Sequence, residues 1–252
     1  TPYTLNFRHL RAVLAIGEKG SISAAATDVN LSQPAITQGL ARLEAAFAHS
    51  LFDRQSDGMT PTLAGRLLLS RISMALDHIA TAARAIKRSG GFDRLERLLS
   101  MAQIRALVAV AQTGSFVSAA QATGISQPAI HNATRDVEQL SNVALVERRG
   151  RGVVLTPEGL LLARGFRLAI GELEAAISEL EALRGIDSGR IAIGAMPLSR
   201  IRLLPKVVSF FYRQYQGVDV AISEGVYAEL IESLRDGNLD LLVGAMRTPP
   251  PG

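Results

Sequence analysis

The run Ser-Gln-Pro-Ala-Ile occurs twice in this chain, at residues 32–36 and 126–130. A serine before a helix caps it and can also reach a phosphate, and a glutamine in the first helical turn can bond both edge atoms of an adenine. Capping alone explains the serines, and the first helical turn explains the prolines, so both alternatives stay open. The candidates for contact with bases and sugars are Ser32, Gln33, Pro34, Thr37 and Gln38 in the first copy, and Ser126, Gln127, Pro128, His131 and Asn132 in the second.

Arginines near these runs are candidates for contact with phosphates. They are Arg42, Arg54, Arg135, Arg148, Arg149 and Arg151. Residues 1–90 carry ten Lys and Arg against six Asp and Glu, whereas the two signs balance in 91–185 and in 186–252. The net charge of +4 therefore lies in the first segment. Such a charge suits a polyanionic partner, although an isolated arginine is more often a solvated surface residue.

Both runs belong to a longer repeat with an offset of 94 residues. Between Gly20 and Gly65, 15 of 46 positions are identical to those from Gly114 to Gly159, without a gap. A match of this length indicates a duplicated domain.

Each copy predicts a helix, a tight turn and a second helix, followed by a hairpin. Ser21 and Ser115 are expected to cap the first helix of the pair, and Ser32 and Ser126 the second. Asn30 or Gly124 lies between the helices, as residues that tolerate the left-handed conformation. Residues 51–54 and 145–148 predict short strands that turn back at glycines, which places a hairpin, or wing, behind each pair.

An apolar stripe with mostly alternating steps of three and four residues follows each hairpin, as in a coiled coil. The first comprises Leu68, Ile72, Ala75, Leu76, Ile79, Ala83 and Ile86, and the second Leu162, Phe166, Ala169, Leu173, Ala176, Ile177, Leu180 and Leu183. Each stripe is covered either by another chain or by the other stripe of the same chain, and the pattern leaves both open. Arg88-Ser89-Gly90-Gly91 is the expected joint between the copies.

The pattern changes at Gly189. Strands are expected at 190–194, 218–222 and 239–243, with helices at 199–215 and 227–235. This alternation predicts a parallel sheet, and small molecules bind such folds beyond the carboxyl ends of the strands. Ser199, at the start of a helix, is a candidate for binding an anionic or polar small molecule, and a plain N-cap explains it equally well.

The pattern from GS-x-x-x-A-A through SQPAI to the glutamate, the LF-x-R strand and TPEG resembles the winged helix-turn-helix of LysR-type transcriptional regulators. The resemblance implies a mainly α chain with an α/β C-terminal part. It comprises two tandem winged helix-turn-helix domains with long linker helices (1–90 and 91–185) and the start of a periplasmic-binding-protein-like parallel domain (186–252). It implies sequence-specific binding to double-stranded DNA, a homodimer or higher homo-oligomer through the linker helices, and a small-molecule effector. The family ordinarily has one such module, and the short C-terminal part predicts a truncated effector domain.

Other classes of function find little support in the sequence. The four histidines lack metal-ligand spacing, no phosphate-binding glycine loop occurs, and no cysteine is present, so we expect no catalysis, metal or cofactor. The chain carries no long apolar run and no leader pattern, which predicts a cytoplasmic protein away from membranes. A protein–protein adaptor that no longer binds DNA stays open, because Asp57 and Asp136 place acids in the wing and the second helix.

Overall fold

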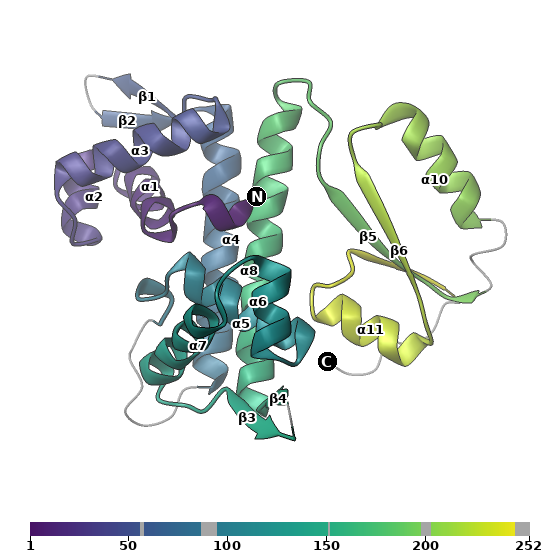
Figure 1. Ribbon diagram of the computed structural model, residues 1–252. Helices are drawn as coiled ribbons and strands as arrows, with labels where there is room; N and C mark the ends of the chain where they lie inside the picture. The colour runs from purple at the N-terminus through teal and green to yellow at the C-terminus, as the bar shows by residue number, and fades with distance from the viewer. Residues whose placement is uncertain (56–57, 87–94, 151, 198–202, 245–252) are drawn as a thin grey trace. The chain divides into compact units, whose positions relative to one another are not determined.

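The computed structural model describes residues 1–55, 58–86, 95–150, 152–197 and 203–244. The chain divides into two compact units, Thr1–Leu180 and Glu181–Gly252 (Figure 1). The expected joint at residues 88–91, Arg151 and Ser199 lie outside the described residues.

The first unit contains the same order of elements twice. The first module is formed by η1 (Pro2–Thr4), α1 (Phe7–Lys19), α2 (Ile22–Asp28), α3 (Gln33–Phe47), β1 (Phe52–Gln55), β2 (Gly58–Pro61) and α4 (Leu63–Ile86). The second module is formed by η2 (Leu95–Arg97), α5 (Met101–Thr113), α6 (Phe116–Thr123), α7 (Gln127–Ser141), β3 (Val146–Arg149), β4 (Gly152–Leu155) and α8 (Pro157–Ala182). In each module one short 3-10 helix and three α-helices precede an antiparallel hairpin and one long helix.

The predicted helix caps are confirmed. The hydroxyls of Ser21 and Ser115 accept hydrogen bonds from backbone amides three residues on, and those of Ser32 and Ser126 do the same for α3 and α7. The turn residue Asn30 has a φ of 53°, in the left-handed region that asparagine tolerates better than most residues. Local sequence therefore sets where α3 and α7 begin; these second helices of the two helix-turn-helix pairs are the predicted recognition helices.

Two residues that are identical in the copies fasten each hairpin to its module. Glu44 Oε1 accepts a hydrogen bond from the Leu51 amide at 2.8 Å, and Glu138 Oε1 does the same for the Leu145 amide at 2.8 Å. A Cβ atom on Gly65 would lie 2.0 Å from the carbonyl oxygen of Leu51, so only glycine fits there. These contacts fix the wing relative to the recognition helix.

The long helices α4 and α8 pack against each other within the first unit (Figure 1). Most stripe residues of both helices are buried in one shared core, which is the intrachain alternative that the sequence left open. Arg71 contacts Glu172 and Glu179, whereas Gly165 lies against Ala82, so the helices run antiparallel. Leu183, which the predicted stripe included, follows the end of α8 and is 42% exposed.

The second unit is a three-stranded parallel sheet with the strand order β6-β5-β7. Its elements are β5 (Arg190–Ala195), α10 (Leu203–Gln214), β6 (Asp219–Glu224), α11 (Tyr227–Arg235) and β7 (Leu241–Val243). The predicted parallel pairing is therefore confirmed. Within the described residues, no helix combines the length and the apolar character needed to cross a membrane.

Candidate nucleic-acid interface

The recognition helix α3 separates an apolar face from a polar one. Ile36, Leu40 and Leu43 are buried in the core of the first unit. The predicted contact residues lie exposed: Ser32, Gln33, Pro34, Thr37, Gln38 and Arg42. The first turns of α3 therefore present hydrogen-bonding groups to solvent, as insertion into a major groove requires.

Hydrogen bonds within the module order two of these side chains. Gln33 Nε2 donates to Ser23 Oγ of α2 at 3.3 Å, and Thr37 Oγ1 donates to the Gln33 carbonyl at 3.0 Å. Gln33 is thus held toward α2, whereas the Gln38 side chain is exposed in the next turn. Of the two glutamines, Gln38 is the freer one for base contact.

A cationic environment surrounds the face that α1 and α3 share. Partial burial lowers the pKa of His9 below its ordinary value, and the charges of Arg42 and Arg8 lower it further. The ring of His9 lies next to Gly39 of α3, since a Cβ atom there would be 3.0 Å from His9 Cδ2. Arg8 is exposed and was not among the sequence candidates, because a single arginine on a first helix carries no distinctive pattern.

The recognition helix α7 also exposes its opening turn, but several of its side chains differ from those of α3. Ser126, Gln127, Pro128, Asn132 and Arg135 are exposed. His131 is half-buried, because its ring packs edge-on against Phe116 of α6 with 5.1 Å between the centroids. Asp136 and Arg135 occupy the positions of Arg42 and Ala41, so α7 offers its charges in a different arrangement.

Two polar residues of α7 replace apolar residues of α3 in the core. Thr134 and Ser141 are buried at the positions of Leu40 and Phe47. Thr134 Oγ1 donates to the Ile130 carbonyl at 2.9 Å and Ser141 Oγ to the Val137 carbonyl at 2.7 Å. Both hydroxyls are satisfied within the helix, so neither substitution leaves its own hydroxyl unpaired in the core.

The two wings carry the arginines predicted to contact phosphate. Arg54 on β1 is exposed, and so are Arg148 and Arg149 on β3. Cross-strand pairs in the second wing join Arg148 to Val153 and Arg149 to Gly152, which holds these two arginines on a regular hairpin. The second wing is the more cationic of the two, because Gln55 stands where β3 has Arg149.

The described residues hold no cluster of three His, Asp or Glu side chains that could bind a metal ion. Sequence reasoning overlooked the role of Thr62 and Thr156, although both are identical in the repeat. Each hydroxyl accepts a hydrogen bond from a glycine amide of the long helix, at 3.0 Å, and donates to a carbonyl before the first wing strand. The repeat identity was the available signal, since both threonines tie wing to long helix.

The fold and this geometry agree with two sequence models of one family. The model described as the bacterial regulatory helix-turn-helix protein, lysR family, matches residues 7–66 and 101–160. The model described as the LysR substrate binding domain matches residues 184–252. The chain belongs to the LysR family.

Several proteins named as regulators are similar over large parts of this LysR-family chain. "HTH-type transcriptional regulator GalR" of Pseudomonas putida is 31% identical over 242 residues, which are 96% of this chain and 60% of that protein. "Probable hydrogen peroxide-inducible genes activator" of Streptomyces viridosporus is 36% identical over 61% of this chain and 49% of its own. An H2O2-bound mutant of OxyR from Corynebacterium glutamicum is 30% identical with a TM-score of 0.37, covering 55% of this chain and 43% of that one. The chain thus spans about half to three fifths of the curated relatives it matches.

Proposed function

We propose that this LysR-family chain is a sequence-specific, double-stranded-DNA-binding transcription regulator with two winged helix-turn-helix modules. One observation carries the proposal: the polar opening turns of α3 and α7 are exposed, while the opposite faces of both helices are buried. The names of the relatives, which are those of regulators, support it.

The individual contacts follow from helix position. We propose that the exposed side chains of the first two turns, with Gln38 and Asn132 foremost, contact base edges, and that the wing arginines bind phosphates. Contact with DNA is expected to raise the pKa of His9, because nearby phosphates favour its charged form.

The second unit is proposed to bind a small-molecule effector, so that the effector concentration controls DNA binding. The match to the LysR substrate binding domain supports this role, and in a parallel sheet of this kind the site is expected beyond the carboxyl ends of the strands. Ser199 follows β5 in the chain and remains the proposed residue for contact. Association of copies into a homo-oligomer through the linker helices, and a division into 1–90, 91–185 and 186–252, are likewise predictions.

Selection of bound sites from a random duplex library tests the proposal. We expect one motif to be enriched, with an affinity that falls steeply as salt rises. Replacing Arg148 and Arg149 with alanine should lower the salt slope by about 2, since each phosphate contact accounts for about 1. Arg213→Ala, the loss of an exposed cation on α10 in the other unit, is the matched control and should change nothing. A chain that enriches no duplex would be an adaptor rather than a regulator.

A further inference from the structure

Contacts between the two modules occur in reciprocal pairs related by the repeat offset. Arg11 of α1 donates to the Arg97 carbonyl of η2. With the repeat offset of 94 residues, Arg11 corresponds to Arg105 of the second module, and Arg97 corresponds to Tyr3 of the first. These two equivalent residues also meet, because the Arg105 guanidinium lies 5.1 Å from the centre of the Tyr3 ring. In an interface with a two-fold axis every contact occurs twice: position i of one half meets position j of the other, and position j of the first half meets position i of the second.

The long helices repeat this relation. Arg71 bonds Glu172, and the positions that correspond to these are Gly165 and His78. Gly165 does lie against His78, because a Cβ atom there would be 2.9 Å from the His78 carbonyl oxygen. The two modules are thus related as the two halves of a symmetric dimer would be, although one chain supplies both.

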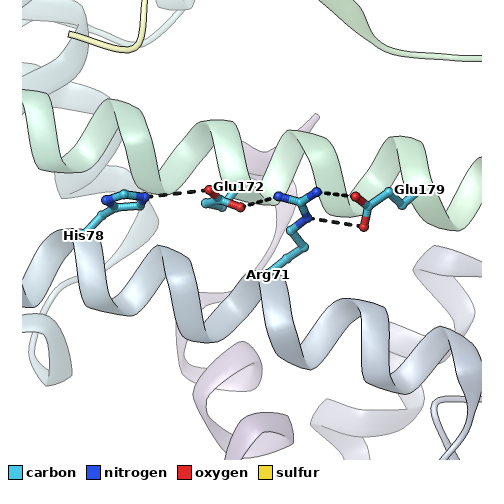
Figure 2. A network of polar contacts seen from close by, with 4 residues as sticks. All are labelled: Arg71, His78, Glu172 and Glu179. Carbon is cyan, nitrogen blue, oxygen red and sulfur yellow. Dashed lines mark hydrogen bonds and ion pairs between the residues drawn. The ribbon is translucent and has the colours of Figure 1, made fainter. Parts of the chain in front are cut away.

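Charge makes the contact between α4 and α8 specific. Arg71 Nη1 lies 2.7 Å from Glu172 Oε2, the guanidinium also bonds Glu179, and His78 Nε2 lies 3.7 Å from Glu172 (Figure 2). All four side chains are half-buried or nearly so, which limits solvent screening. The carboxylates of this network come from α8 and their basic partners from α4.

Like helices could not pair in this way. Two copies of α4 would set Arg71 against His78 and Ala85, which stand at the positions of Glu172 and Glu179 and offer no carboxylate. Two copies of α8 would set Gly165 of one copy against Glu172 and Glu179 of the other, so no arginine would meet these carboxylates. The side chains therefore select α4 with α8 over either symmetric pair.

The two recognition helices of this pair differ in sequence. Thr37, Gln38 and Arg42 in α3 correspond to His131, Asn132 and Asp136 in α7. We propose that Thr1–Leu180 forms a complete two-headed DNA-binding unit within a single chain, which binds a duplex containing two unlike half-sites. This inference rests on the proposed function and adds which partner the site takes: an asymmetric operator. A further copy would then associate through surfaces other than the α4–α8 contact.

The alternative arrangement is an exchanged dimer, in which α4 of one copy pairs with α8 of another. Charge reversal distinguishes this arrangement from pairing within one chain. One full-length variant carries Arg71→Glu, and a second carries Glu172→Arg with Glu179→Arg. Each should unfold about 4 to 8 °C below the unaltered chain, because like charges then face each other. A third variant with all three changes restores the ion pairs in cis and should recover most of that shift.

The decisive sample is a mixture of the first two variants, refolded together from denaturant. Pairing within each chain predicts that the mixture keeps both lowered midpoints. Exchanged helices would restore all ion pairs between the unlike chains, so recovery in the mixture overturns the single-chain unit.

Selection from the random duplex library then tests the sequence preference of each recognition helix, α3 and α7, separately. We expect an enriched site without two-fold symmetry, in which Gln38→Ala relaxes the preference in one half and Asn132→Ala in the other. A palindromic site whose halves respond equally to both variants overturns the inference. A chain that enriches no duplex refutes the proposed function itself, whereas recovery in the mixture or a palindromic site refutes only the single-chain arrangement.

Discussion

Gly165 marks the closest approach of α8 to α4 and offers a sharp test of their pairing. A Cβ atom at this position would lie 2.5 Å from the Ala82 Cβ and 2.9 Å from the His78 carbonyl oxygen. Gly171 lies on the same helix six residues later, where a Cβ atom would meet nothing within 4 Å. Alanine substitution at these two positions thus compares a tight helix–helix contact with open space on one helix.

The expected effects on the free energy of unfolding have opposite signs. Alanine stabilises a helix interior by about 0.5 to 1 kcal/mol relative to glycine, which is the whole effect expected for Gly171→Ala. Gly165→Ala has the same gain but also forces the helices apart, and overpacking of a well-packed core costs about 1 to 3 kcal/mol. With two contacts this short we expect the upper part of that range and a net loss of about 1 to 2 kcal/mol.

Chemical denaturation of both variants and the unaltered chain, followed by circular dichroism, measures these differences. Thermal midpoints should fall by about 3 to 6 °C for Gly165→Ala and rise by about 1 to 3 °C for Gly171→Ala. Equal stabilisation by both substitutions would show that α4 does not cover Gly165 in solution, and the argument for intrachain pairing would fail.

Three further predictions concern the modules themselves. Ala48 ends α3 with a φ of 53°, so Ala48→Gly should raise the free energy of unfolding by about 0.5 to 1 kcal/mol; an unchanged or lower value in urea denaturation would contradict the strain. Glu138→Ala removes the acceptor of the Leu145 and Val146 amides and should cost about 1 to 3 kcal/mol in the same assay, with glutamine recovering part of the loss. Because the pKa of His9 is lowered in the folded protein, this histidine is protonated at a higher pH in the unfolded chain than in the folded one. The free energy of unfolding therefore keeps its full value above about pH 6.5 and declines as the pH falls toward the folded pKa. The decline should weaken in His9→Gln, and an unchanged pH profile would exclude this linkage.

The order of elements in each module was predictable because it rests on local chemistry. Ser32 and Ser126 cap their helices, and Asn30 adopts the left-handed turn, whatever else the chain does. The parallel sheet of the second unit was predictable for a similar reason, since strands that alternate with helices have few other arrangements.

The partner of each apolar stripe was not predictable. An apolar stripe such as that of Leu68 and Ile72 indicates that this face of the helix is covered. The same pattern is expected whether the covering helix belongs to another chain or to the same chain. The choice depends on Arg71 meeting Glu172 and Glu179, which lie about a hundred residues away and become neighbours only in the antiparallel register. Likewise, the half-burial of His131 depends on Phe116 of the preceding helix, and residue spacing in the sequence does not predict this contact.

Directed cleavage of DNA tests the central claim, that both recognition helices lie against the duplex. The chain contains no cysteine, so Ala45→Cys on α3 and Gln139→Cys on α7 each provide one exposed attachment point at matched positions for an iron–EDTA reagent. Bound to the selected duplex, each conjugate should cut the DNA at its own place, one in each half of the site. Cuts that are absent, or spread evenly along the duplex for both conjugates, would contradict the account.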